Sequence, residues 1–247
     1  MVLNSERGPS QILKSIDLDV GRGEVVGIVG RSGAGKTTLL RLLAGLVPPT
    51  SGTILLDGEQ MGAPTGEVIT VFQDYVNALL PWRTVEKNVA LGLESSTKKR
   101  ERDERVATAL RMVGLEGSAR ERPRSLSGGM QQRVQIARAL AVRPEVLLMD
   151  EPFGALDAMT RATLQDELRR LQSQTGATII FITHDIEEAV YLSDRVLVMV
   201  GPPGMIVQEV RTELPAERDQ LTTRELPRFL DVRHQLVTTL TALAEKA

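Results

Sequence analysis

The segment "GRSGAGKTT", from Gly30 to Thr38, matches the pattern G-x-x-x-x-G-K-[ST] in full. The run before it, "EVVGIVG", is continuous and β-branched, which predicts a strand buried on both faces. The run after it, "KTTLLRLLAGL", predicts a helix that stops at "VPPTSG". Strand, glycine loop and helix together let backbone N–H groups surround a phosphate at the positive end of the helix. The sequence therefore predicts a P-loop rather than a glycine-rich turn that happens to contain a lysine.

The residues of this P-loop have distinct expected tasks. Lys36 is expected to reach the β- and γ-phosphates of a bound nucleotide, and Thr37 to place its hydroxyl on Mg²⁺. The residues predicted to bind phosphate are Gly30, Arg31, Ser32, Gly33, Ala34, Gly35, Lys36, Thr37 and Thr38.

Polar side chains follow three further strand-like runs. After "VLLM", Asp150 is expected to hold Mg²⁺, directly or through water, and Glu151 to accept a proton from the attacking water. A lone acidic pair is often only a polar turn, but with a P-loop it predicts the second half of a phosphate site. His184 follows "TIIFIT", where ligands collect in open α/β sheets, so a γ-phosphate contact is favoured over a structural histidine. Gln73 follows "VITVF" and is a candidate for orienting water or completing the Mg²⁺ shell, although chemistry alone does not single it out.

The pattern along the rest of the chain predicts an α/β core interrupted by helices. "ILKSIDLDV" (12–20) alternates enough to predict a strand, and "TILLDG" predicts a short strand ending at an Asp57-Gly58 turn. Helical patterns fill the region from Val85 to Pro144, including a charged helix within 98–114 and an amphipathic helix over 130–142. Strand, helix and strand then alternate, which implies right-handed crossovers and a mostly parallel sheet. A last helix is predicted over 227–244.

The composition narrows the class of function. A formal charge of −2 and a mixed-sign cluster from Lys98 to Arg105 give no basic field, so wholesale nucleic-acid binding is not expected. The chain has no cysteine, which rules out disulfides and thiolate metal sites and fits a reducing compartment. The first residues, "MVLNSERGPSQ", have no apolar core of the kind that a secretory signal needs, and no apolar run approaches the roughly 18 residues needed to span a bilayer. Any membrane contact is therefore expected to go through a partner.

A second glycine pair, in "LSGGMQQR" (Leu126 to Arg133), also follows a serine and opens a predicted helix. Together with the P-loop, the glutamine after "VF", "LLMDEP", "GALD" and "ITHD", in this order, it resembles the ABC-type ATPases from about Gln11 onward. The resemblance implies ATP and Mg²⁺ as cofactors and a head-to-tail homodimer. Each P-loop would then face the partner's signature residues Ser127, Gly128 and Gly129, with Asp157 at the dimer interface.

The implied fold is a P-loop NTPase core with a mostly parallel sheet, a small N-terminal antiparallel β part and an inserted all-helical subdomain. The implied division of the single domain 1–247 is a core of about 11–75 and 145–210, a helical subdomain of about 76–144, and a C-terminal helix of about 226–244. The Mg²⁺ ligands would be Thr37, Gln73 and Asp150, and the catalytic residues Glu151, His184 and Gln73.

Within the ABC-type ATPases, the sequence most resembles the importers of nitrate, sulfonate and taurine type. This resemblance rests on "VFQDYVNALLPWRTVEKNVALGL", "DEPFGALDAMTR", "THDIEEAVYLSDRVLVM" and "GPPGMIV". It implies an ATP hydrolase that energises import of a small oxyanion through a separate permease, with a solute-binding protein acting indirectly. The chain would be peripheral to the cytoplasmic face of a bacterial inner membrane. Tyr75 to Val89 would lie beside the groove that grips the permease, with Trp82 near it unless this tryptophan is a half-buried core residue.

Alternatives to an importer remain in view. They are an ABC ATPase for another solute, a soluble ABC protein acting on DNA or the ribosome, and a regulatory pseudo-ATPase. A single cassette without heptads or a basic patch argues against the soluble class. The intact motif residues Lys36, Asp150, Glu151, Ser127 and His184 argue against the pseudo-ATPase.

One feature departs from the family pattern. Family members carry an aromatic residue some way before the P-loop that stacks on adenine, but no aromatic residue precedes Phe72 here. Either the adenine is held without stacking or the true start lies upstream. The sequence therefore predicts weaker discrimination of ATP from GTP than is usual in the family.

Overall fold

A central six-stranded sheet organises the described part of the chain, residues 2–5 and 8–245 of the computed structural model. Its strand order is β10-β9-β3-β8-β7-β6. Only β10 is antiparallel to its neighbour in this sheet, and the other pairs are parallel. The strands are β3 (Val25–Gly30), β6 (Val68–Val71), β7 (Val146–Asp150), β8 (Thr178–Ile182), β9 (Arg195–Val200) and β10 (Met205–Arg211). The predicted fold class, an α/β core with a mostly parallel sheet, is confirmed.

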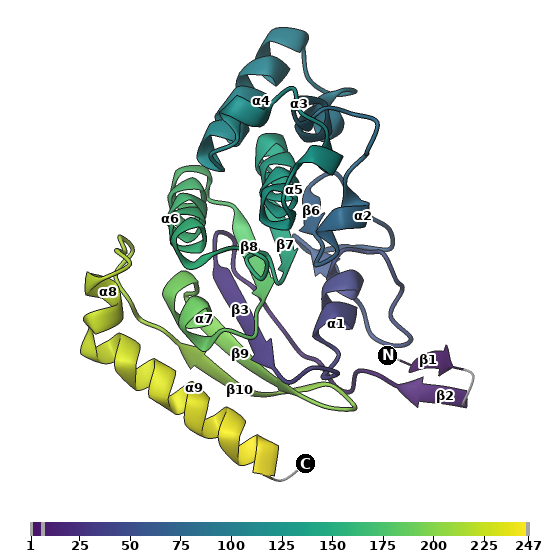
Figure 1. The fold of residues 1–247 in the computed structure, drawn as a ribbon. Helices are drawn as coiled ribbons and strands as arrows, with labels where there is room; N and C mark the ends of the chain where they lie inside the picture. The colour runs from purple at the N-terminus through teal and green to yellow at the C-terminus, as the bar shows by residue number, and fades with distance from the viewer. Residues whose placement is uncertain (1, 6–7, 246–247) are drawn as a thin grey trace.

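The central strands are apolar on both faces because helices cover both. In β3, Val25 and Val29 pack in one core cluster, and Val26 and Ile28 pack in the other. The first cluster includes residues of α5 (Gly128–Val142), α6 (Ala158–Thr175), α7 (Ile186–Leu192) and α9 (Pro227–Glu245). The second includes α1 (Lys36–Leu43). Figure 1 shows α9 running along the α7 side of the molecule.

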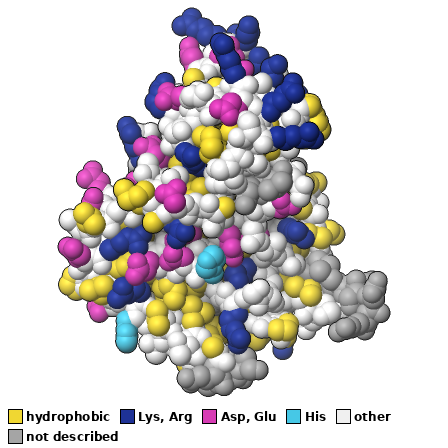
Figure 2. Space-filling view, viewed as in Figure 1, with side chains coloured by type: hydrophobic (Ala, Val, Ile, Leu, Met, Phe, Trp, Pro, Cys, Tyr) yellow, Lys and Arg dark blue, Asp and Glu magenta, His cyan; other side chains and the backbone are white. Residues whose placement is uncertain are grey.

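Helices dominate the stretch between β6 and β7, as predicted. They are α2 (Tyr75–Ala78), α3 (Val85–Val89), α4 (Lys99–Met112) and α5, with single 3₁₀ turns at 90–93, 116–118 and 123–125. In Figure 1, α3 and α4 lie at the upper end of the molecule, and α5 and α2 lie below them. The surface of α4 carries charges of both signs. Arg100 forms a salt bridge with Glu104, and Arg105 forms one with Glu101. Figure 2 shows this end covered with Lys and Arg and with Asp and Glu among them, so the prediction of a solvated face holds.

Helix α5 is buried more completely than its sequence predicts. An amphipathic helix would bury one face, which Val134, Ala137 and Leu140 form, but Ile136 and Ala139 are buried as well. The reason is that α2, α3 and α4 pack on α5 while its other side meets β6. A helix enclosed in this way buries polar residues as well as apolar ones, here Gln132 and Gln135, and buried polar groups need partners.

The predicted strand over 12–20 is wrong. Only Leu13 makes an isolated bridge, with Gly204, and the remaining residues are irregular. Ser15 has a φ of 47°, which breaks an extended conformation. The alternation arises because Ile16, Leu18 and Val20 pack, partly buried, against the α1 side of the core. An irregular segment can pack one side on a core without forming a ladder.

Two small antiparallel hairpins accompany the main sheet. They pair β1 (Val2–Ser5) with β2 (Gly8–Gln11), and β4 (Leu55–Leu56) with β5 (Glu59–Gln60). The second turns at Asp57 and Gly58, which both have positive φ, as the Asp-Gly pair predicts. Past the sheet, α8 (Thr222–Glu225) leads into α9, whose Phe229, Val232 and Leu236 are buried. No helix in residues 2–5 and 8–245 has the length and hydrophobicity that crossing a bilayer demands.

Candidate active site

The predicted site residues meet at one edge of the sheet. Strands β3, β6, β7 and β8 are parallel, so their carboxyl ends lie together. The P-loop follows β3, and Gln73 lies two residues past β6. Asp150 ends β7, Glu151 directly follows it, and His184 lies two residues past β8. In open α/β sheets this is the edge at which ligands bind.

The P-loop is packed closely against neighbouring residues at the start of α1. Gly35 caps the helix with a φ of 86°, a left-handed conformation, and a Cβ there would lie 2.7 Å from Cδ2 of Leu13. Lys36 is largely buried, and its Nζ donates to the carbonyl oxygens of Gly30 at 2.7 Å and Arg31 at 2.9 Å. The ammonium is thus held inside the loop that would surround a phosphate.

Opposite charges are buried beneath this loop. Burial lowers the pKa of Lys36, while the nearby carboxylates of Glu151 and Asp150 act against this effect. Burial also raises the pKa of Asp150, whose side chain hydrogen-bonds Thr37. A buried carboxylate joined to a hydroxyl, with the Gln73 amide at the same edge, forms a set of hard oxygen donors that suits Mg²⁺. The residues present therefore fit the expected ion.

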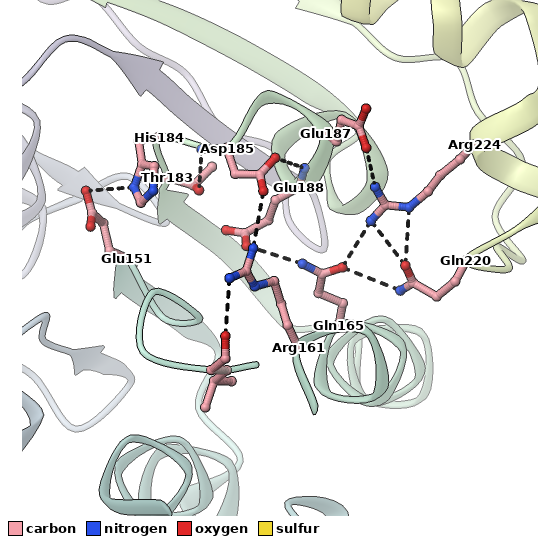
Figure 3. Close-up of polar contacts among 11 residues, drawn as sticks. Glu151, Arg161, Gln165, Thr183, His184, Asp185, Glu187, Glu188, Gln220 and Arg224 are labelled. Atoms are coloured by element: carbon pink, nitrogen blue, oxygen red, sulfur yellow. Dashed lines mark hydrogen bonds and ion pairs between the residues drawn. The ribbon is translucent and has the colours of Figure 1, made fainter. Parts of the chain in front are cut away.

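Glu151 lies between two of the other predicted catalytic side chains. Its Oε2 accepts a hydrogen bond from Gln73 Nε2 at 3.1 Å, and its Oε1 lies 3.4 Å from Nδ1 of His184. The Glu151 side chain is 25% exposed, so water can reach it, whereas the neighbouring Asp150 is buried. Figure 3 shows the carboxylate pointing toward His184. The arrangement can orient a water molecule and accept its proton.

The signature residues open α5 at the surface. Ser127 is exposed and caps the helix, its Oγ accepting from the Met130 N–H at 3.3 Å. Gly128 and Gly129 form the first turn, so the helix N-terminus faces outward with free N–H groups, the geometry of an anion site. Asp157 caps α6 in the same way, and hydrogen bonds from Thr160 lower its pKa.

A family model described as ABC transporter matches residues 13–154 of the chain. The chain belongs to the ABC transporter family.

Relatives of this ABC protein support the same assignment. A nitrate import ATP-binding protein of Synechococcus elongatus is 45% identical over 91% of this chain, which spans only 34% of that longer protein. A nitrate transport protein of Klebsiella oxytoca is 44% identical over 91% of this chain and 87% of its own length. An uncharacterized ABC transporter ATP-binding protein of Methanocaldococcus jannaschii is 48% identical, with 92% and 84% covered.

A solved structure has the same fold. It is a dimeric post-hydrolysis state of an ATP-binding cassette bound to ADP and Pi, with 32% identity and a TM-score of 0.77 over 85% of this chain and 94% of that one. The predicted ABC ATPase fold is confirmed.

A groove on the helical end of this ABC protein contains Trp82. The groove has a volume of about 870 Å³, and Glu86 of α3 and Val106 of α4 are among the residues that line it. Trp82 is 69% exposed, so the reading as a half-buried core residue is wrong. The loop that carries Trp82 is fixed from below, because Arg138 of α5 donates to Ala78 O at 2.8 Å and to the Asn88 side chain at 2.8 Å.

Two polar groups near the site carry no signal in the sequence. Arg161 of α6 donates to the carboxylate of Asp185 at 3.4 Å and to Leu156 O at 3.2 Å, which ties the loop after Glu151 to the loop of His184 (Figure 3). An arginine on a mostly polar helix resembles a solvated residue, and only packing reveals this role. The second is Gln132, whose amide contacts the backbone of Glu151.

Proposed function

We propose that this chain is the ATP-hydrolysing subunit of an importer for a small oxyanion, working as a homodimer beneath a separate membrane permease. Relatives named for nitrate and for bicarbonate transport support the oxyanion class. The dimeric cassettes of the same fold support the homodimer. The chain would then be peripheral to the cytoplasmic face of a bacterial membrane, with a solute-binding protein acting through the permease.

The observation that carries the hydrolase part is the position of Glu151 between Gln73 and His184. In this proposal the P-loop amides and Lys36 bind the phosphates of ATP. Glu151 holds the attacking water and takes its proton, and His184 contacts the γ-phosphate. Thr37, Asp150 and Gln73 would hold Mg²⁺, which neutralises phosphate charge when bound.

The homodimer explains why the chain has two phosphate-binding segments. Ser127 and Gly129 lie at an exposed helix N-terminus, which is suited to the γ-phosphate of ATP held by the partner's P-loop. Asp157 would lie at the same interface. Each ATP would be complete only when the two subunits close, so hydrolysis would follow opening and closing of the dimer.

Replacement of Glu151 by glutamine tests the hydrolase assignment. Removing a general base typically costs about 10² to 10⁴ in rate. We expect Glu151→Gln to bind ATP with unchanged affinity, to lose hydrolysis by this factor, and to form a stable dimer with ATP by light scattering. Hydrolysis at the parental rate would refute Glu151 as the base.

Exposed Trp82 tests the permease partner. The tagged protein would be recovered from detergent-solubilised host membranes, and the co-purified multi-span protein identified by mass spectrometry. We expect Trp82→Ala to reduce this recovery and to leave ATP hydrolysis of the isolated chain unchanged. Leu221→Ala, an equally exposed apolar residue that does not line the groove, is the matched control.

If Trp82→Ala recovers as much permease as the parent protein does, the groove is not the permease-binding site. If the parent protein recovers no membrane protein, the assignment as an importer subunit is refuted. The solute-binding protein of the recovered system can then be titrated with nitrate, bicarbonate and taurine. Binding of none of them would overturn the oxyanion class.

A further inference from the structure

We propose that Gln132 is a positioning residue that holds the backbone of Glu151 in its active conformation and joins it to the signature helix α5. This inference rests on the proposed role of Glu151 as the base. Gln132 lies in the segment "LSGGMQQR", three residues past Gly129, and none of the tasks assigned above uses its side chain.

The side-chain amide of Gln132 makes one hydrogen bond through its nitrogen and one through its oxygen, both to the turn that follows β7. The side chain is buried, with 2% exposure. Its Nε2 donates to the carbonyl oxygen of Glu151 at 3.0 Å, and its Oε1 accepts from the N–H of Ala155 at 3.0 Å. One amide therefore clamps the two ends of the turn that follows β7. No aliphatic side chain of this size supplies both a donor and an acceptor.

The backbone of Glu151 needs such support. Its φ is 47°, a left-handed conformation that is strained for a non-glycine residue. Its N–H donates to Ile182 O at 2.9 Å, and its carbonyl oxygen accepts from Gly154 N at 3.3 Å as well as from Gln132. The direction of the carboxylate follows from this backbone conformation. A relaxation of the turn would move the carboxylate away from Gln73 and His184.

The first turn of helix α5 packs closely on the same turn at Gly129. A Cβ on Gly129 would lie 3.1 Å from the carbonyl oxygen of Ala155, so the first turn of α5 approaches the backbone closely. Gln132 adds its two hydrogen bonds one turn further along. The signature segment and Glu151 of one chain, which serve two different ATP molecules in the proposed dimer, are therefore held as one unit.

The test is Gln132→Met, which keeps the length of the side chain and removes both hydrogen bonds. Because a misplacement of about 1 Å in an active site can cost about 10² in rate, we expect kcat to fall by about 10- to 100-fold. The KM and the Kd for ATP should stay within about twofold, since the P-loop is untouched. Gln132→Asn keeps an amide too short to span both partners and should also lower kcat. It replaces the methionine variant if the latter does not fold.

Gln135→Met is the matched control. Gln135 lies on the same helix, is 4% exposed, and its Oε1 has no hydrogen-bond partner within the described residues. It is expected to keep the parental kcat. A fall in kcat equal to that of Gln132→Met would show that any loss of a buried amide in α5 has this effect, and would overturn the proposal.

A double-mutant cycle with Glu151→Gln separates positioning from general structural damage. If Gln132 acts through Glu151, Gln132→Met should not reduce the residual hydrolysis of Glu151→Gln any further. An additional 10- to 100-fold loss in the double variant would overturn the proposal, as would a parental kcat for Gln132→Met alone. Parental hydrolysis by Glu151→Gln itself would instead refute the proposed base, so the two failures are distinguishable.

Discussion

Glu188 is a buried carboxyl of α7, and replacing it with glutamine is expected to stabilise the protein most at alkaline pH. The residue is 4% exposed and accepts a hydrogen bond from Gln165 Nε2 at 3.2 Å (Figure 3). Burial raises its pKa from 4.5 to about 7, and repulsion from Asp185 adds to this. Hydrogen bonds from Thr183 and Gln165 and the charge of Arg161 act in the opposite direction.

The sign of the pH dependence follows from which state holds the proton. Between pH 4.5 and 7 the folded protein keeps a proton that the unfolded chain releases. Folding is therefore favoured by this group at low pH, and that advantage is lost as the pH rises through 7. Each pKa unit corresponds to about 1.4 kcal/mol, so the penalty of the carboxyl at pH 8 approaches about 3 kcal/mol. At pH 5 it stays below about 1 kcal/mol.

Glutamine is uncharged at every pH, so Glu188→Gln should remove this penalty. We expect the free energy of unfolding to rise by about 2–3 kcal/mol at pH 8 and by less than about 1 kcal/mol at pH 5. Urea unfolding followed by far-UV circular dichroism, without nucleotide, measures both values. Glu225→Gln, at an exposed position on α8, is the control. It should change the free energy of unfolding by no more than about 0.5 kcal/mol at either pH. An equal effect at both pH values, or destabilisation at pH 8, would refute the reasoning.

Two further predictions concern α9 and the base of the nucleotide. Leu236→Ala removes a fully buried side chain of α9 and should lower the free energy of unfolding by about 2–5 kcal/mol in the same urea assay. A loss below about 1 kcal/mol would mean that α9 is not packed on the core in solution. Because no aromatic residue precedes Phe72, the stabilisation of about 1 kcal/mol from an aromatic ring stacked on adenine is absent. The Kd values for ATP and GTP should therefore agree within about tenfold. A much stronger preference for ATP, measured by calorimetry, would contradict this.

Patterns of neighbouring residues were enough to predict the P-loop and the strands that position the candidate site. The buried β-branched run before Gly30 and the helix after it form one contiguous unit, so their residues specify the P-loop without reference to distant segments. Parallel strands then align their carboxyl ends, and this places Gln73, Glu151 and His184 at one edge whatever the details of packing. The segment 12–20 was predicted wrongly because alternating apolar residues report one-sided burial, which an irregular chain with Ser15 at positive φ also satisfies.

The P-loop, the acidic pair after the β7 run and each family motif could be read from the sequence, because each consists of residues that are neighbours along the chain. By contrast, the packed fold was needed to show that Gln132 clamps the turn of Glu151, that Arg161 reaches Asp185, and that Trp82 is exposed. The first two contacts depend on how α5 and α6 pack against loops about 20 residues away along the chain. A buried amide or guanidinium must find partners wherever packing places it, and no local pattern records which partners those are.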